Sequence, residues 1–253
     1  MLEYTDIGSG PALLIVHGLY GSARNWGVIS KRLSDTRRII TVDMRNHGDS
    51  PHFSTNSYPD MAQDLADVIT RIGAPMDVLG HSMGGKASMT LALTQPALIN
   101  SLIVADIAPV PYTHTQVHNI HAMKAVDLSQ VTRRSDAAAQ LDSAGVDPDI
   151  QAFLLQSLDV TGKRWKLNLD VLEAEMPKII SFPHFETQFD GPTLFLSGAT
   201  SDYVRSKDRD TIKARFPNAR FAKIPDAGHW LHAQRPRAFE AAVRTYLDAV
   251  AAL

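Results

Sequence analysis

The segment VLGHSMGG, residues 78–85, decides the fold: it is a short apolar run that breaks into the pattern Gly-x-Ser-x-Gly. It continues as KASMTLAL, residues 86–93, which favours a helix. Gly80 and Gly84 flank Ser82 at a distance of two residues, where a sharp turn from strand to helix has no room for β-carbons. Such a turn strains the serine backbone and pushes the hydroxyl outward, so Ser82 is a candidate nucleophile.

Two backbone N–H groups are candidates for stabilising negative charge beside Ser82. The N–H of Met83 would lie at the start of the helix, aligned with the positive end of the helix dipole. The other is the N–H of Leu19, because Gly18 directly follows a buried strand and lets the backbone curl toward the same space. Gly-x-Ser-x-Gly also occurs by chance in loops, but here an apolar run precedes it and a helical run follows it, as this turn requires. The segment therefore predicts a nucleophile with an oxyanion hole.

The composition suits one large α/β domain or a domain with an insertion, since 44% of the 253 residues are hydrophobic and 21% are charged. With 25 basic and 27 acidic residues the net charge is −2, which argues against nucleic acid or an anionic membrane as a partner. The lack of cysteine excludes disulfides, a cysteine nucleophile and thiolate metal sites. We find no leader-like amino terminus and no apolar run long enough to span a bilayer, so we expect a cytoplasmic protein, with its oligomeric state left open.

Buried strands alternate with helices along most of the chain, which is typical of a parallel sheet with right-handed crossovers. A strand and a GSGP turn open the chain, and further apolar runs predict strands at residues 12–16, 38–43, 102–109, 192–198 and 220–224. Helices are expected at residues 25–33, 59–71, 206–216 and from 236 onward. Ligands collect at the carboxyl ends of parallel strands, where Leu19, Ser82 and Asp106 are all expected.

Residues 111–189 differ from the rest because they are helical in character and contain no buried-strand run. We interpret them as a helical cap inserted into a core formed by residues 1–110 and 190–253. A cap of this kind excludes water and lines an acyl pocket. Five large apolar side chains either line that pocket or form the core of the cap itself, and these are Phe153, Leu154, Leu158, Trp165 and Met176.

Three histidines of the cap, His114, His118 and His121, are spaced to share one side of a helix, which is a weak metal signal. No carboxylate stands at a matching spacing, so we predict neither a metal nor another cofactor.

The general base is expected late in the chain. His229 follows Gly228 on a loop after the last strand, which is the position that a general base takes in this topology. His232 is the alternative, but it stands where the chain enters its next helix. His17, at the end of a central strand, is either catalytic or fixes loop geometry through hydrogen bonds, and we favour the second role.

Three further polar residues, Asp43, His47 and Asp49, are tempting acid or base candidates. They precede Ser82, whereas hydrolases with this serine turn place the acid and the histidine after the serine. The loop that holds them is rich in short hydrogen-bonding side chains, which suits a rigid loop beside a site. We therefore interpret all three as structural.

Taken together, these motifs resemble the α/β-hydrolase superfamily over essentially the whole chain. The resemblance is carried by HG at residues 17–18, GHSMGG at 80–85 and GHW at 228–230. Within the superfamily the chain closely resembles the YbfF-type esterases of bacteria, which have relatives among mitochondrial hydrolases of this fold. That resemblance rests on VDMRNHG at 42–48, GHSMGGK at 80–86, DIAPV at 106–110 and Trp165. It implies a mostly parallel central sheet flanked by helices, with the cap inserted after the strand that ends near Asp106.

The resemblance leaves two acids open for the predicted triad. The superfamily usually places its acid three residues after the glycine that closes the next strand, and this position is Ser201 here, with Asp202 one step further. YbfF-type esterases are expected to draw the acid from the preceding strand, which matches Asp106. Ends of neighbouring strands lie about 5 Å apart, so either acid could reach His229, and we favour Asp106. Because the amino terminus is short, the sequence does not determine which strand forms that edge of the sheet.

The resemblance implies a serine carboxylesterase that cleaves small to medium acyl esters through an acyl-enzyme on Ser82. Thioester hydrolysis and carbon–carbon bond hydrolysis use the same triad and stay open. Haloalkane and epoxide chemistry is disfavoured because it needs an aspartate in place of Ser82. A non-catalytic ligand-binding protein on the same fold is the alternative of a different class. The sequence does not indicate the physiological substrate.

Overall fold

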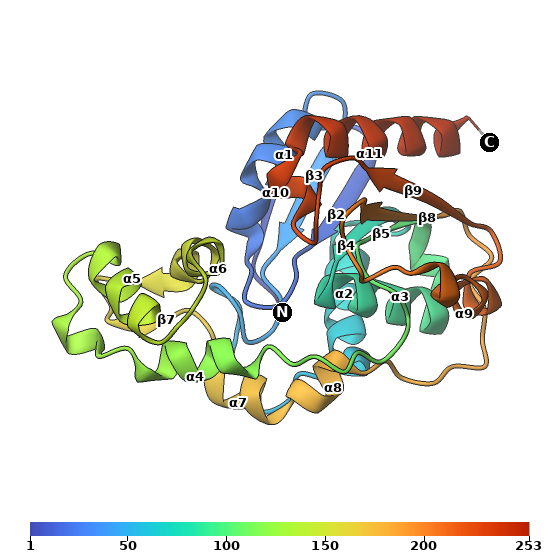
Figure 1. The fold of residues 1–253 in the computed structure, drawn as a ribbon. Coiled ribbons are helices and arrows are strands. Elements are labelled where there is room, and N and C mark those ends of the chain that lie inside the picture. The colour runs from blue at the N-terminus through green and yellow to red at the C-terminus, as the bar shows by residue number, and fades with distance from the viewer. Residues whose placement is uncertain (253) are drawn as a thin grey trace.

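The computed structural model describes residues 1–252, and its centre is a seven-stranded sheet with the strand order β1-β3-β2-β4-β5-β8-β9 (Figure 1). The strands are β1 (Tyr4–Ile7), β2 (Ala12–Val16), β3 (Arg38–Val42), β4 (Met76–His81), β5 (Ile99–Ala105), β8 (Thr193–Gly198) and β9 (Ala219–Ile224). Every pairing in this sheet is parallel except that of β1 with β3. The mostly parallel sheet predicted from the sequence is therefore confirmed.

The amino-terminal strand forms one edge of the sheet. β1 pairs with β3, with Tyr4 opposite Val42, and not with β2, which follows it in the chain. The GSGP turn between β1 and β2 thus joins two strands that are not neighbours. The reason is that β2 already has a parallel partner on each side, β3 and β4.

Helices cover both faces of the sheet (Figure 1). One face carries α1 (Gly27–Leu33), α10 (Leu231–Gln234) and α11 (Pro236–Ala251), and the other carries α2 (Tyr58–Ile72), α3 (Met83–Thr94) and α9 (Arg209–Arg215). Successive side chains of β2 point to opposite faces, so Leu13 and Ile15 join the apolar cluster of α1 and α11, whereas Leu14 and Val16 join that of α2 and α3. A strand buried on both faces is apolar at every position, which is why its run is continuous.

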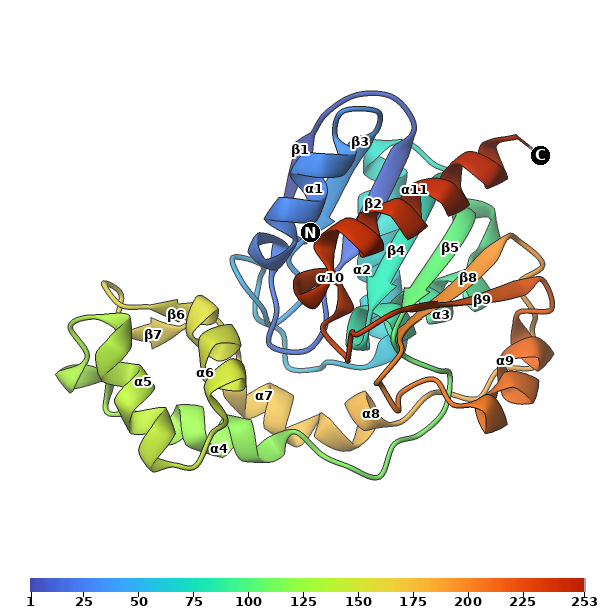
Figure 2. The ribbon, with the colours of Figure 1, turned by 45° about the horizontal axis from the view of Figure 1, so that its top comes forward.

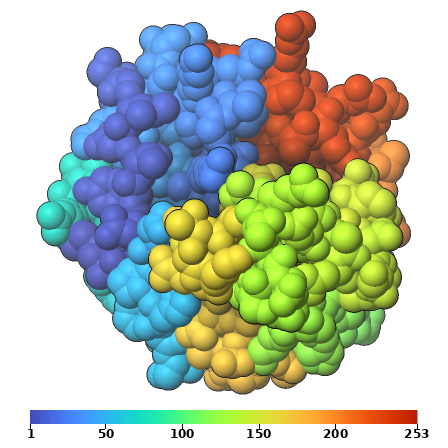
Figure 3. Space-filling model, turned by 90° about the vertical axis from the view of Figure 1, so that its left-hand side faces the viewer, coloured from blue at the N-terminus to red at the C-terminus, as the bar shows by residue number. Residues whose placement is uncertain are grey.

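The chain between β5 and β8 adds a separate body of helices at the carboxyl ends of the strands (Figure 2). It contains α4 (Val117–Ala125), α5 (Arg134–Ser143), α6 (Pro148–Leu154), α7 (Leu169–Ala174) and α8 (Met176–Ile180). It also contains a two-stranded ribbon of β6 (Leu158–Asp159) and β7 (Arg164–Trp165), which no apolar run in the sequence indicated. We call residues 111–189 the cap, and Figure 3 shows its green and yellow surface over the middle of the molecule, with the core around it.

Short 3-10 helices link several elements: η1 (Ala23–Trp26), η2 (Pro96–Leu98), η3 (Leu128–Gln130), η4 (Leu155–Ser157) and η5 (Ser206–Asp208). Among residues 1–252, none of the helices combines the length and the apolar character that crossing a bilayer requires.

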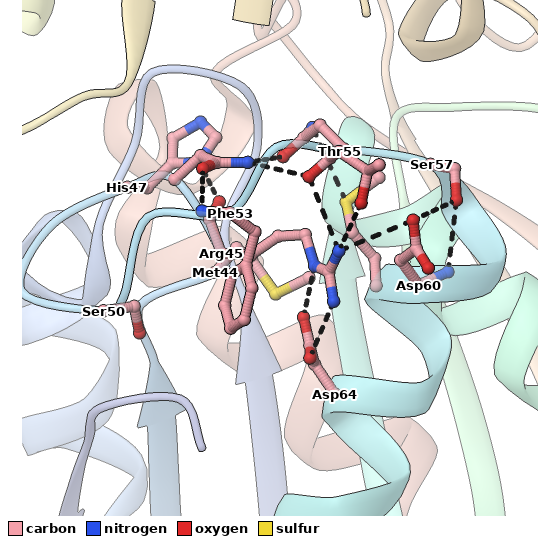
Figure 4. Close-up of polar contacts among 12 residues, drawn as sticks. Met44, Arg45, His47, Ser50, Phe53, Thr55, Ser57, Asp60 and Asp64 are labelled. Carbon is pink, nitrogen blue, oxygen red and sulfur yellow. Dashed lines mark hydrogen bonds and ion pairs between the residues drawn. The ribbon is translucent and has the colours of Figure 1, made fainter. Parts of the chain in front are cut away.

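The loop after β3 belongs to the core and forms hydrogen bonds to the cap. His47 forms an isolated β-bridge with Leu167 of the cap, and the N–H of Gly48 donates to the carbonyl of Lys166 at 2.8 Å. Nearby, Arg45 fixes this loop to α2, because its guanidinium donates to both carboxylate oxygens of Asp64 at 2.6 and 3.0 Å (Figure 4). This pair is largely buried, since the side chains are 9% and 14% exposed.

Replacing Arg45 by Met should lower the free energy of unfolding by about 3 kcal/mol, because the largely buried Asp64 carboxylate would lose its cation. Arg38→Met is the matched control: its partner is Asp6, the side chains are 38% and 33% exposed, and the loss should stay below about 1 kcal/mol. Urea denaturation of the two variants measures both losses. Equal losses would contradict the assigned importance of Arg45.

Candidate active site

Ser82 stands at the predicted sharp turn between β4 and α3, and its backbone has φ 52° and ψ −119°. A positive φ is unusual for a residue with a β-carbon, so the turn is strained, as the sequence indicated. A β-carbon on Gly84 would lie 2.4 Å from the carbonyl oxygen of His17, and one on Gly80 would lie 2.4 Å from that of Gly84. Gly84 therefore allows α3 to approach the end of β2 closely, and Gly80 allows it to approach β4.

The structure brings Ser82, His229 and Asp106 into one chain of contacts. His229 lies on the loop between β9 and α10, and its Nε2 is 3.1 Å from Oγ of Ser82. Its Nδ1 is 2.8 Å from Oδ2 of Asp106. With a proton on Nδ1 donated to the carboxylate, Nε2 is free to accept the serine proton.

Asp106 directly follows β5 and is completely buried. Its carboxylate also accepts the backbone N–H of Gly198 at 3.0 Å and the hydroxyl of Ser201. Three donors thus satisfy the buried charge, which would otherwise be costly to remove from water. Two of them come from the end of the neighbouring strand, since Gly198 closes β8 and Ser201 lies in the loop that follows it.

Asp202, the alternative acid, lies at the surface. Its carbonyl oxygen accepts from Nε of Arg205 at 2.9 Å, and within residues 1–252 its carboxylate makes no hydrogen bond to His229. The position where the superfamily usually carries its acid is taken by Ser201, which instead donates to Asp106. Residues that follow β5 and β8 therefore meet at one carboxylate, that of Asp106.

Tyr203 covers the imidazole of His229, a contact that sequence reasoning missed. The rings are stacked with their centroids 4.0 Å apart and an interplanar angle of 23°. The hydroxyl of Tyr112 donates to the carbonyl of Tyr203 at 2.6 Å and accepts the N–H of Ala108 at 2.9 Å, so the loop after β8 is tied to the loop after β5. An aromatic residue in a polar loop carries no signal that would have revealed this role.

The backbone N–H groups of Leu19 and Met83 belong to the same part of the site as Ser82, since all three residues line one cavity. A β-carbon on Gly18 would lie 3.1 Å from that of Ser82, so the loop after β2 lies directly against the serine. Met83 is the first residue of α3, where an N–H has no acceptor within the helix. Both groups are therefore placed where they can serve a ligand.

The cavity over Ser82 and His229 has a volume of about 220 Å³ and lies between the core and the cap. Its wall is largely aromatic and aliphatic. Phe153 and Leu154 of the cap are part of this wall, as the sequence suggested.

Leu158, Trp165 and Met176 do not line the cavity and are buried in the apolar core instead, which is the second of the two roles that the sequence left open. Nε1 of Trp165 donates to the carbonyl of Met123 at 2.9 Å, which fixes this side chain within the cap. Sequence alone could not separate the two groups, because large apolar side chains suit a pocket and a core equally well.

The histidines near the site are held by backbone groups. Nε2 of His17 accepts the N–H of Met44 at 2.9 Å, and its Nδ1–H donates to the carbonyl of Gly18 at 2.8 Å. Nδ1–H of His47 donates to the carbonyl of Arg45 at 2.8 Å. These contacts confirm the predicted role of His17 in loop geometry. Burial lowers the pKa of His17 to about 4 and that of His47 to about 3, so both are neutral at physiological pH.

His232 is also buried, and its ring is stacked on Trp26 with a centroid distance of 4.2 Å. Burial lowers its pKa to about 3. The structure places His229, not His232, in contact with Ser82.

The acids before Ser82 also hold loops. Asp43 accepts the N–H of Ala23 at 2.7 Å and that of Asp49 at 2.8 Å. Asp49 forms an ion pair with Lys166 of the cap, with 2.7 Å between the charged atoms. Both acids thus have the structural roles that the sequence suggested.

The cap histidines do not meet one another at a shared ligand site. His114 contacts the hydroxyl of Tyr203 at 2.7 Å, and His121 pairs with Glu173 at 2.8 Å. Across residues 1–252, His, Asp and Glu side chains form no cluster of three that could hold a metal ion.

Replacing His17 by Gln should reduce the slope with which the free energy of unfolding falls as pH falls. Between pH 6.5 and about 4 the unfolded chain protonates this histidine while the folded protein keeps it neutral, so the free energy of unfolding falls as pH falls, by up to about 1.4 kcal/mol per pH unit. His52→Gln removes an exposed histidine and serves as the control. Urea denaturation at several values between pH 7.5 and 4.5 measures the slopes, and an unchanged slope in His17→Gln would contradict the assignment.

Comparisons with known proteins agree with this architecture. The model of the alpha/beta hydrolase family matches residues 13–242. The chain is 41% identical to the esterase YbfF of Escherichia coli over 239 residues, which cover 93% of this chain and 92% of that protein. It is also 41% identical to the sn-1-specific diacylglycerol lipase ABHD11 of Mus musculus over 249 residues, covering 94% and 81%. Among solved structures, a marine microorganism esterase matches with a TM-score of 0.92 and 38% identity, covering 97% and 98%. The resemblance inferred from the motifs is thus confirmed, and the chain belongs to the alpha/beta hydrolase family, alongside the YbfF-type esterases.

Proposed function

We propose that the protein is a carboxylic ester hydrolase in which Ser82 is the nucleophile, His229 the general base and Asp106 the acid of the triad. The observation that carries this proposal is the unbroken series of contacts from Asp106 through His229 to Ser82 at the wall of a cavity. The similarity to proteins named esterase and lipase supports the same reaction.

In the first half of the reaction, Nε2 of His229 takes the proton of Ser82 while Oγ attacks the ester carbonyl carbon. The carbonyl oxygen becomes an oxyanion, and the N–H groups of Leu19 and Met83 donate hydrogen bonds to it. When the tetrahedral intermediate collapses, the bond to the alcohol oxygen breaks, and His229 returns its proton to that oxygen. The acyl group is then held on Ser82 as an ester.

Water completes the reaction, and it now takes the role of the attacking group that Ser82 had in the first half. His229 takes a proton from the water molecule, the hydroxide attacks the acyl carbon, and the bond to Oγ breaks as Ser82 regains its proton. Asp106 keeps the Nδ1–H tautomer in place and stabilises the imidazolium that forms twice in each cycle. The Ser201 hydroxyl and the Gly198 N–H hold the Asp106 carboxylate in turn.

The cavity indicates the class of substrate. Its wall carries aromatic and aliphatic side chains from the core and the cap, including Phe153, Leu154 and Trp230, and this suits a small to medium acyl group. We therefore propose a small-molecule ester as the substrate. Location in the cytoplasm stays a prediction from the sequence.

Replacing Ser82 by Ala should reduce hydrolysis of p-nitrophenyl butyrate by at least about 10⁴-fold, because it removes the hydroxyl that Nε2 of His229 contacts. Labelling by a fluorophosphonate should disappear with it. Ser88→Ala, on the same helix, removes a hydroxyl that only donates to the carbonyl of Gly84 and should keep both signals. Continued labelling of Ser82→Ala would overturn the proposal. If the ester raises the melting temperature of the unaltered protein but is not hydrolysed, a binding function is favoured.

The choice of acid is tested by Asp106→Asn and Asp202→Asn. We expect Asp106→Asn to lower kcat by about 10³–10⁴-fold, because an amide favours the wrong tautomer of His229. Asp202→Asn should stay within about threefold of the unaltered protein, because this side chain is exposed and does not contact His229. Hydrolysis of p-nitrophenyl butyrate measures both, and a greater loss in Asp202→Asn would reverse the assignment.

A further inference from the structure

Lys86 is an almost completely buried cation close to the serine. It lies one turn of α3 beyond Ser82, and only 1% of its surface is exposed. Its Nζ donates to three backbone carbonyls, those of Val110 at 2.9 Å, Ile180 at 3.1 Å and Ser181 at 2.6 Å. In the part of the chain that the structure describes, no carboxylate pairs with Nζ of Lys86, and burial lowers the pKa of Lys86 to about 7. The three carbonyl acceptors match the three N–H groups of its ammonium form.

The three carbonyls belong to two segments that flank the helices of the cap, one before α4 and one at the end of α8. We call residues 110–112, which lead toward α4, and residues 179–181, which end α8, the hinge segments. Figures 1 and 2 show the chain before α4 running beside α8. The N–H of Tyr112 donates to the carbonyl of Ile180 at 2.9 Å, so the hinge segments also bond to each other.

Two tyrosines strengthen the same junction. The hydroxyl of Tyr58 donates to the carbonyl of Ile179 at 2.6 Å. The Tyr112 ring centroid lies 4.6 Å from Nζ of Lys86, within the range of a cation–π contact. Each of the three ammonium N–H groups has an acceptor, and such charge-assisted bonds are stronger than neutral ones. The buried charge is therefore compensated only while both hinge segments stay against it.

The junction also forms part of the substrate cavity. Tyr58, Lys86, Tyr112, Ile179 and Ile180 all line it together with Ser82. Lys86 follows Ser82 by four residues, which is about one turn of helix or 5.4 Å of rise along α3. A displacement of the hinge segments would therefore change how far the cavity extends from Ser82.

We propose that Lys86 is a positioning residue: its ammonium group clamps the two hinge segments together and thereby fixes the cavity wall that limits the length of the acyl group. This inference rests on the proposed ester hydrolase function of the same site.

The test compares Lys86→Met with Lys166→Met. Both replace a lysine at a junction of core and cap by an unbranched side chain without donors. Lys166, however, pairs with Asp49 at the surface, and Asp49 lies in the loop after β3 and not in a hinge segment. Values of kcat and KM are measured for p-nitrophenyl acetate, butyrate and octanoate. Fluorophosphonate labelling of Ser82 verifies that each variant keeps its nucleophile.

For Lys86→Met we expect the ratio of kcat/KM for octanoate to that for butyrate to rise at least about tenfold. The three bonds to the charged donor are lost, so the hinge segments move and the cavity accepts a longer acyl group. The ratio of kcat/KM for acetate to that for butyrate should change less, because an acetyl group is too short to reach the displaced wall. Lys166→Met should leave the ratio unchanged. An unchanged ratio in Lys86→Met, or an equal rise in Lys166→Met, would overturn the proposal.

Hydrogen exchange provides a readout that does not depend on activity. In the unaltered protein the Tyr112 amide should be as protected as amides of the central strands, and in Lys86→Met it should exchange at least about tenfold faster. Rapid exchange of this amide in the unaltered protein would overturn the clamp, even if Lys86→Met failed to fold. If no ester is hydrolysed by the unaltered protein, the proposed function fails, while the exchange rates still decide whether the clamp exists.

Discussion

The close approach of helix α3 to the end of strand β2 is the constraint on which the site depends. Gly84 lies so near the carbonyls of Val16 and His17 that a β-carbon there would come within 2.5 Å of both. This contact places the strained Ser82 beside the loop that carries Leu19, so the nucleophile and both candidate oxyanion donors are positioned by one packing event. His229, on the loop after β9, contacts the serine, and Asp106, directly after β5, contacts His229.

Neutral imidazoles support this arrangement. His17 joins the loops after β2 and β3 by accepting the N–H of Met44 and donating to Gly18. His81, buried directly before Ser82, donates through Nε2 to the carbonyl of His229 at 2.8 Å. Burial holds the pKa of His81 well below its usual range, so it remains an uncharged donor. Histidine suits such positions because one ring can link two backbone groups at once.

The parts of the fold that could be predicted are those with a local cause. Continuous apolar runs revealed the central strands, and the spacing of Gly80, Ser82 and Gly84 revealed the turn. The order of the motifs along the chain pointed to His229, since parallel strands bring their carboxyl ends together. The partner of β1 was not predictable, because a short amphipathic strand pairs with whichever edge is free. The cap was harder still, because Phe153 and Trp165 look alike in sequence and only their packing separates cavity wall from interior.

The arrangement around Asp106 has an evolutionary consequence. The carboxylate of Asp106 directly follows β5, while the loop after the adjoining strand β8 offers the hydroxyl of Ser201, at the position where the resemblance to the superfamily implied an acid. A lineage that acquired an aspartate at residue 201 would hold two carboxylates within reach of one imidazole, and either could then be discarded. Through such an ancestor with two acids, the triad acid would change from one strand to the next without loss of activity at any step.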